Sequence, residues 1–140
     1  QKNFDFEKII FLDPLEHKEN LKRISTFDLY LDTYPYNGHT GISDSLFQSC
    51  VPTISFTGNS FASRVSYSLL KSSELSELVT YNEKDYFDKI IYFYKNREKL
   101  ISIKNKLLEF KNKNKKRMKK FTLDFEIIIK STFSKYKKYI

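Results

Sequence analysis

With 140 residues, 40% of them hydrophobic and 16% aromatic, the chain is long enough to fold as one globular unit around a packed core. The longest apolar runs, such as residues 9–12 and 127–129, fall well short of the roughly 20 residues that a membrane-spanning helix needs, so the sequence predicts no transmembrane segment. The net charge of +8 comes from one late segment, because residues 95–120 hold 12 Lys or Arg against 2 Asp or Glu, whereas residues 1–94 hold 9 against 13.

Short strands and helices are predicted to alternate along the first two thirds of the chain. The strands are expected at Lys8–Asp13, Phe27–Thr33, Val51–Phe56 and Leu78–Thr80. The helices are expected at Glu16–Thr26, Thr40–Ser49, Phe61–Lys71 and from Asn82 to about Asn96, with Thr40, Ser60 and Asn82 as their candidate N-caps. This alternation is typical of a parallel α/β sheet with right-handed crossovers.

The last third of the chain is predicted to be helical throughout. Apolar residues recur at helical spacing in two stretches, which are Leu100, Ile103, Leu107 and Phe110, and then Phe125, Ile128, Ile129, Phe133 and Tyr136. We therefore divide the chain into an α/β lobe over residues 1–96 and a basic helical tail over residues 97–140.

The single cysteine and the N-terminal residues bear on the cellular setting. Cys50 has no second cysteine to pair with, which excludes an internal disulfide and a cysteine-based zinc cluster and favours a reducing, cytoplasmic setting. The chain starts at Gln1 without a basic stretch leading into an apolar core, so nothing in it resembles a secretory signal. Because it also lacks an initiator Met, we expect it to be a piece of a longer chain.

The segment from Asn37 to Asp44 (NGHTGISD) carries the candidate chemistry. It lies between a predicted strand and a predicted helix, which is where open parallel sheets bind ligands. Unpaired amides at a helix start favour an anion such as a phosphate or diphosphate, to which His39 and Thr40 could add donors. Asp44, one turn later, could accept hydrogen bonds from a ribose. An ordinary turn with an N-cap explains the same residues equally well, since neither GxGxxG nor a Walker lysine is present.

Residues 31–70, LDTYPYNGHTGISDSLFQSCVPTISFTGNSFASRVSYSLL, resemble the O-linked N-acetylglucosamine transferase family, with its SPINDLY-type and bacterial TPR-linked members. Those enzymes carry LDT, NGHTT and FASRV motifs in this order. The resemblance implies an inverting, two-lobed GT-B glycosyltransferase, of which this chain is the C-terminal Rossmann-like lobe, incomplete at its N-terminus. It also implies a UDP-sugar donor such as UDP-GlcNAc, a Ser or Thr hydroxyl on a protein acceptor, and metal-independent catalysis without a cofactor.

The family's site residues map onto this chain only in part. The resemblance implies that His39, Thr40 and Gly41 hold the diphosphate and that Asp44 holds the ribose, although Gly41 replaces a Thr of the family motif. Upstream, it places Asn20 where the family has a His against the uracil, His17 where a basic residue is expected, and Arg23 near the base. No catalytic residue is expected in this chain, because the general base and the acceptor groove belong to the N-terminal lobe, which TPR repeats precede in some members. No metal site is expected.

One further residue and two alternative functions stay open. Arg64, in the FASRV motif, is either a phosphate ligand or a structural residue that pairs with Asp32 or Asp44, and we favour the structural role. The Lys-rich segment 95–120 would suit a nucleic-acid-binding module, although a solvated helix explains it better, so we do not expect a nucleic-acid partner. A third reading is a non-catalytic relic of the transferase lobe, which Gly41 and Asn20 would favour.

Overall fold

A three-stranded parallel sheet forms the centre of the protein. The computed structural model describes residues 6–137, apart from the side chains of Phe6 and residues 114–118. Strands β1 (Tyr30–Leu31), β2 (Thr53–Phe56) and β3 (Val79–Thr80) lie in the order β1-β2-β3. In the parallel register Tyr30 pairs with Thr53, and Ser55 pairs with Val79. The predicted α/β class with a Rossmann-like parallel sheet is confirmed.

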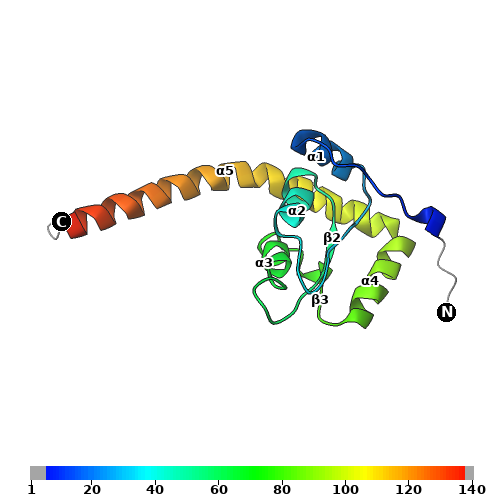
Figure 1. The fold of residues 1–140 in the computed structure, drawn as a ribbon. Coiled ribbons are helices and arrows are strands. Elements are labelled where there is room, and N and C mark those ends of the chain that lie inside the picture. Colours follow the sequence, from blue (N-terminus) through cyan, green and yellow to red (C-terminus); the bar gives the residue numbers. More distant parts are fainter. Residues whose placement is uncertain (1–5, 138–140) are drawn as a thin grey trace.

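Helices surround this sheet (Figure 1). They are η1 (Phe6–Lys8), α1 (His17–Ser25), α2 (His39–Ser43), η2 (Asp44–Gln48), α3 (Val65–Ser72), η3 (Ser76–Leu78), α4 (Glu83–Lys95) and α5 (Arg97–Tyr136). Helices α2 and α3 lie on one side of the sheet and α4 on the other, while the first turns of α5 cross the end of the sheet at which the strands begin. The side chain of Lys111 in α5 donates to the carbonyl oxygen of Gln48, 2.5 Å away, at the last residue of η2.

The cap of α4 follows the prediction, whereas the two other predicted N-caps are wrong. The Asn82 side chain accepts a hydrogen bond from the amide of Asp85 at 2.8 Å and caps α4. Helix α2 instead begins at His39 after Gly38, one residue before the expected start, so Thr40 lies inside it. Helix α3 begins only after Arg64, because the hydroxyl of Ser60 accepts from the Ser63 amide in a turn of its own.

The predicted strand at Lys8–Asp13 is wrong. Its apolar side chains face solvent, with Ile10 78% and Phe11 92% exposed, and the segment beyond η1 has no regular structure. An apolar run becomes a buried strand only where a neighbouring strand can accept its backbone hydrogen bonds. Among the described residues the sheet consists of β1, β2 and β3, and none of them pairs with this run.

The predicted helix at Thr40–Ser49 changes type in its middle. After the five residues of α2 the chain continues as the π-helix η2, in which the amide of Ser49 donates to the carbonyl oxygen of Asp44, five residues earlier, at 2.8 Å. Buried Cys50, at φ 55°, then ends the helical run. Such π-turns are frequent at functional sites, and this one begins at Asp44.

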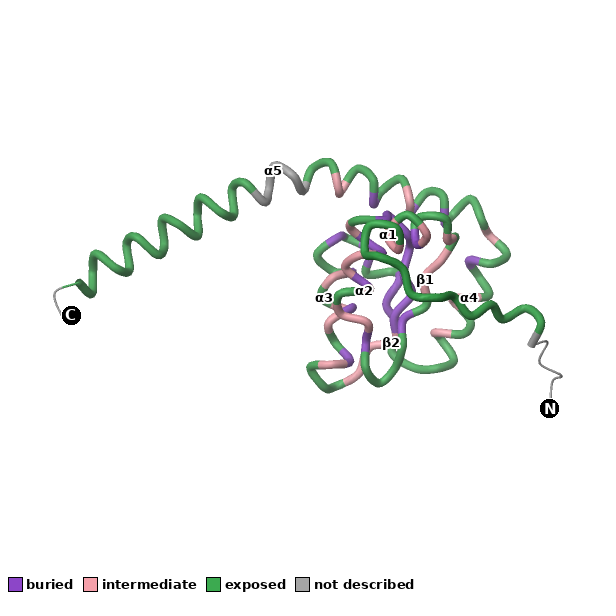
Figure 2. The backbone as a smooth tube through the Cα atoms, turned by 45° about the horizontal axis from the view of Figure 1, so that its top comes forward, coloured by how far each residue is buried: buried purple, intermediate pink, exposed green. Residues whose placement is uncertain are grey.

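The hydrophobic core joins the sheet, its flanking helices and the start of α5. Buried core residues include Ile42, Leu46, Ile54, Leu70 and Leu78 of the α/β part, together with Leu100, Ile103 and Leu107 of α5. The two predicted helical stretches of the tail form one continuous helix of 40 residues. Its far half, from Phe121 to Tyr136, extends away from the core with its apolar side chains exposed (Figure 2). None of the helices in the described part of the chain is both long and apolar enough to cross a membrane.

Candidate functional site

The buried carboxylate of Asp32 fixes the loop that follows β1. Asp32 is only 5% exposed, and one of its oxygens, Oδ1, accepts hydrogen bonds from the backbone amides of Thr33 at 2.9 Å and Gly38 at 2.8 Å. The other oxygen, Oδ2, accepts from the hydroxyl of Ser55 in β2 at 2.6 Å. The carboxylate therefore ties both ends of the loop to the neighbouring strand, and it sets where α2 begins.

Asn37 joins this loop to the loop that follows β2. Its backbone amide donates to the carbonyl oxygen of Ala62 at 3.0 Å, and its side-chain amide donates to the carbonyl oxygen of Thr33, also at 3.0 Å. Asn37 is fully buried, and its Oδ1 atom has no hydrogen-bond partner among the described residues. The loops at the carboxyl ends of two adjacent parallel strands thus form one unit.

The start of α2 leaves backbone amides open to a ligand. Its N-cap, Gly38, has φ −79° and ψ 82° and offers no side chain for capping. The first amides of a helix have no acceptor within the helix, and they carry its positive dipole end. The side chain of Thr40 in this first turn is exposed to solvent. The predicted strand, loop and helix are therefore present, although β1 is only two residues long and α2 begins one residue early. His39, Thr40 and Gly41 lie in the uncapped first turn.

Two exposed aromatic side chains hold the ring of His39. Tyr36 stacks on it with ring centroids 4.9 Å apart, and Phe61 meets it edge-on at 5.9 Å. Tyr36 is 64% and Phe61 82% exposed. The Nε2 atom of His39 lies 3.4 Å from the carbonyl oxygen of Ala62. A proton on Nε2 would point at this carbonyl, so the Nδ1 atom is the one left for a ligand.

Asp44 lies beside His17, a pair that sequence reasoning assigned to the same site. A carboxylate oxygen of Asp44 is 3.8 Å from Nδ1 of His17, and the contact is ionic only when the imidazole is protonated. The Asp44 side chain is 18% exposed and that of His17 68%. Helix α1 packs against η2 and so brings the two residues together.

Asn20 and Arg23 contact each other and not the start of α2. Nη2 of Arg23 donates to Oδ1 of Asn20 at 2.8 Å, and Nη1 donates to the carbonyl oxygen of Asp13 at the same distance. Both partners belong to α1 or to the segment before it. The guanidinium that was expected near a base is thus held along its own helix.

Sequence reasoning missed Tyr30, whose hydroxyl borders the helix start. A Cβ atom added at Gly41 would lie 3.2 Å from this hydroxyl. Burial, followed by the negative charges of Asp32 and Asp44, raises the pKa of Tyr30, so the group is a neutral phenol and a hydrogen-bond donor. The alternation of side chains along a strand places Tyr30 and Asp32 on one face, a signal from which it could have been found.

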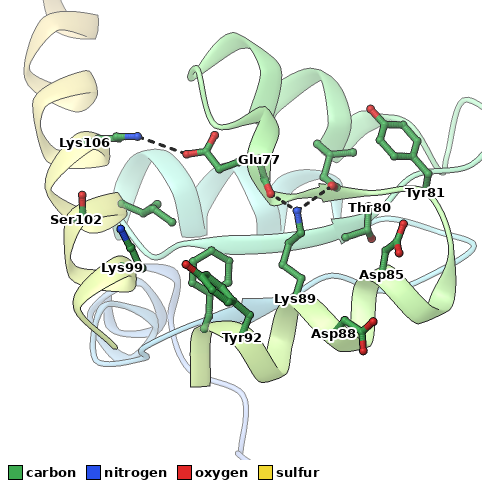
Figure 3. Close-up of a pocket in the computed structure, with 13 residues that line it drawn as sticks. Glu77, Thr80, Tyr81, Asp85, Asp88, Lys89, Tyr92, Lys99, Ser102 and Lys106 are labelled. Carbon is green, nitrogen blue, oxygen red and sulfur yellow. Dashed lines mark hydrogen bonds and ion pairs between the residues drawn. The ribbon is translucent and has the colours of Figure 1, made fainter. Parts of the chain in front are cut away.

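The largest cavity that we describe lies away from this site. It measures about 790 Å³ and opens between β3, α4 and the start of α5 (Figure 3). Lys89 crosses it and donates to the backbone carbonyl oxygens of Glu77 and Val79, which covers the open edge of β3. His39, Thr40 and Asp44 line neither this cavity nor the two of about 310 Å³. Among the described residues, no cluster of three or more His, Cys, Asp or Glu could hold a metal ion.

Comparisons with known proteins relate this α/β unit to glycosyltransferases. Over 123 residues, 87% of this chain, it is 32% identical to a tomato (Solanum lycopersicum) protein named as a probable UDP-N-acetylglucosamine–peptide N-acetylglucosaminyltransferase SPINDLY, and it spans 13% of that relative. It is 35% identical over 74 residues to a Giardia intestinalis enzyme named as a UDP-N-acetylglucosamine–peptide N-acetylglucosaminyltransferase, which covers 52% of this chain and 5% of the relative.

A solved structure and a family model agree with these relatives. The structure of an O-GlcNAc transferase variant from Thermobaculum terrenum superposes with a TM-score of 0.70 and 27% identity, over 73% of this chain and 19% of the other. The chain is therefore similar to a small part of a much longer protein. The model of glycosyl transferase family 41 matches residues 1–124. The chain belongs to glycosyl transferase family 41.

Proposed function

We propose that this chain is the donor-binding C-terminal part of a cytoplasmic protein O-GlcNAc transferase, and that the start of α2 receives the diphosphate of UDP-GlcNAc. The observation that carries the proposal is the uncapped helix start, which directly follows a loop fixed by Asp32. Unpaired amides and a positive dipole end at the carboxyl edge of a parallel sheet form a binding site for a phosphate. The relatives named above are N-acetylglucosaminyltransferases, which supports the choice of donor.

Three residues act on the diphosphate in this proposal. The amide of Gly41 and the amide and hydroxyl of Thr40 donate to phosphate oxygens. His39 contributes its ring, whose Nδ1 atom donates to a phosphate oxygen when both ring nitrogens carry a proton and Nε2 donates to the carbonyl oxygen of Ala62. These groups stabilise the negative charge that develops on the departing UDP, as preorganised donors do wherever charge develops in a transition state, and they need no metal ion for it.

Asp44 binds the ribose in the same proposal. Its carboxylate is largely shielded from water, lies one helical turn from the diphosphate site, and accepts hydrogen bonds from the sugar hydroxyls. His17 lies 3.8 Å away and is positioned to orient that carboxylate. Asn20 and Arg23, further along α1, lie nearer to the base in this proposal. The hydrogen bond between their side chains holds them in place.

The remaining groups of the reaction belong to the parts of the protein outside this chain. The chain spans 13% of its tomato relative and 19% of the solved structure that it resembles. We therefore place the general base and the groove for the protein acceptor on an N-terminal lobe, with or without TPR repeats before it. The chain alone is expected to bind the donor weakly and to transfer nothing.

Calorimetric titration with UDP, GDP and ADP tests the proposal. UDP should bind in preference to the other two, and Asp44→Ala should weaken UDP binding by about 1 to 3 kcal/mol through the loss of the ribose hydrogen bonds. Asp88→Ala is the matched control, because Asp88 is exposed on α4 and pairs with Lys84, one turn earlier on the same helix. Equal affinity for the three nucleotides would instead indicate a non-catalytic relic of the transferase lobe. Unchanged UDP affinity in Asp44→Ala would remove Asp44 from the site.

The structure gives little support to a nucleic-acid-binding tail. Three lysines of the basic segment contact the α/β part of the protein. Lys104 donates to the carbonyl oxygen of Ser25 at 3.2 Å, and Lys106 pairs with Glu77 at 3.5 Å. Lys111 donates to the carbonyl oxygen of Gln48. Tight binding of a generic oligonucleotide with a steep salt dependence would revive this alternative.

A further inference from the structure

A second cavity lies at the same edge of the sheet as the proposed donor site. It measures about 310 Å³ and is bounded by the loop after β2 and by the residue after β3. Six residues line it, namely Thr57, Gly58, Asn59, Arg64, Tyr67 and Tyr81. The carboxyl edge of a parallel sheet is where ligands bind, and this volume lies at the lower end of the range for small-molecule sites.

The lining of this cavity carries positive charge and hydrogen-bond donors without an acid. Of the six residues one is a cation, Arg64, and none is Asp or Glu. Hydroxyl groups come from Thr57, Tyr67 and Tyr81, and an amide comes from Asn59. The ammonium of Lys71 lies 3.5 Å from the hydroxyl of Tyr67 and adds a second positive charge nearby. This combination suits an anionic oxygen group and no cation.

The guanidinium of Arg64 has no partner in the described part of the chain. The expected pairing with Asp32 or Asp44 is wrong. The oxygens of Asp32 accept from Ser55 and from two backbone amides, and Asp44 faces His17. Arg64 is exposed, so solvent and ligands can reach its donors.

The position of Arg64 at the start of α3 makes the positive charge near the cavity stronger. Arg64 is the N-cap residue of α3, and its side chain forms no capping hydrogen bond. A cation at the positive end of a helix dipole is unfavourable unless an anion lies near it. Arginine also matches the two oxygens of a phosphate with its planar pair of donors.

We propose that this cavity binds a phosphate group through Arg64, with Asn59, Tyr67 and Tyr81 as further donors. The cavity is separate from the start of α2, because none of its six lining residues belongs to α2, and Ala62, whose carbonyl oxygen lies against Asn37 and His39, does not line it. The phosphate belongs either to the donor itself or to a second phosphorylated ligand. The proposal does not depend on the identity of the donor.

Two-dimensional NMR of the isotope-labelled chain, titrated with inorganic phosphate and separately with UDP, tests this proposal. Phosphate should shift the amide signals of residues 57–64 and of Tyr81. Arg64→Gln should weaken that binding about tenfold or more, as expected for the loss of a charge-assisted pair of hydrogen bonds, and Arg64→Lys should restore part of it. Lys119→Gln, which removes the positive charge of an exposed residue of α5 just before Phe121, is the matched control and should leave it unchanged.

The titrations distinguish the two sources of the phosphate, and one set of results would overturn the proposal. If UDP shifts the same signals and competes with phosphate, the donor supplies the phosphate; if UDP shifts only residues 39–44 and phosphate still binds, a second ligand does. Phosphate that shifts no signal in residues 57–64, or binds Arg64→Gln and Lys119→Gln equally, overturns the proposal. Circular dichroism of each variant verifies the fold, and Tyr81→Phe, which removes one donor hydroxyl, gives an independent second test.

Discussion

Replacing Asp32 should destabilise the protein more than any other carboxylate substitution described above. In Asp32→Ala the amides of Thr33 and Gly38 and the hydroxyl of Ser55 lose their acceptor. Of these donors, the Ser55 hydroxyl belongs to a buried residue. A hydrogen bond to a charged group contributes about 1.5–3 kcal/mol, and an orphaned buried donor costs about 1–3 kcal/mol. Because the three bonds share one carboxylate, their losses are not additive, and we expect a decrease of about 3–5 kcal/mol in the free energy of unfolding.

Asparagine at the same position separates the hydrogen bonds from the charge. In Asp32→Asn the side-chain oxygen can still accept from Gly38 and Thr33, whereas its amide group meets Ser55, so the loss should be about 1–2 kcal/mol. Urea denaturation followed by circular dichroism measures both variants. Asp28→Ala is the control, since its carboxylate is exposed and forms only a surface ion pair, with Arg97, worth less than about 1 kcal/mol. A loss in Asp32→Ala no larger than in this control would refute the reasoning.

Two further predictions concern the core and the response to alkaline pH. Leu107→Ala should lower the free energy of unfolding by about 2–5 kcal/mol, because Leu107 is 1% exposed, whereas Leu108→Ala, at a 46% exposed site, should change it by about 0.5 kcal/mol or less in the same urea titration. Burial and then the charge of Asp32 raise the pKa of Tyr86 to about 12 in the folded protein, so its contribution to stability should be complete below pH ~10 and lost as the pH rises through about 12. In Tyr86→Phe this part of the alkaline loss should be absent, and a decline identical to that of the unchanged protein would contradict the assignment.

Local sequence patterns predicted an element correctly where its stabilising partners lie close by in the sequence. Helix α4 was predicted with its cap, because Asn82 and the amide of Asp85 lie three residues apart and need no distant partner. Strand β2 was predicted from its apolar, β-branched run, and it lies between two other strands as such a run requires. The loop from Asn37 and the helix that follows it were predicted from two glycines and a helical pattern.

Patterns failed where the outcome depends on a distant partner. Residues 8–13 have the composition of a buried strand, but no described strand pairs with them. The apolar side chains of the far half of α5 have helical spacing, yet Phe125 is 53% and Ile128 60% exposed. Amphipathic patterns report which face is apolar, and they do not report which surface covers it. The contact of His17 with Asp44 was likewise open until the packing of α1 was known.

The position of the Tyr30 hydroxyl beside Gly41 gives a physical reason for a glycine, and not a threonine, at position 41. A threonine at position 41 would bring a hydroxyl to the helix start, but its Cβ would lie 3.2 Å from the Tyr30 hydroxyl, which is closer than side chains normally approach. We infer that Tyr30 and Gly41 compensate each other, with the phenol as the donor where the threonine hydroxyl is missing.

A double-mutant cycle tests this compensation. Gly41→Thr alone should lower the melting temperature despite the better helix propensity of Thr, because Tyr30 must move. In the Tyr30→Phe background, which removes the crowding hydroxyl, the same change should cost less, and it should restore UDP affinity that Tyr30→Phe alone has lost. Additive effects of the two substitutions on both the melting temperature and UDP binding would show that the two groups are independent, since residues in contact give a coupling of about 0.5 kcal/mol or more.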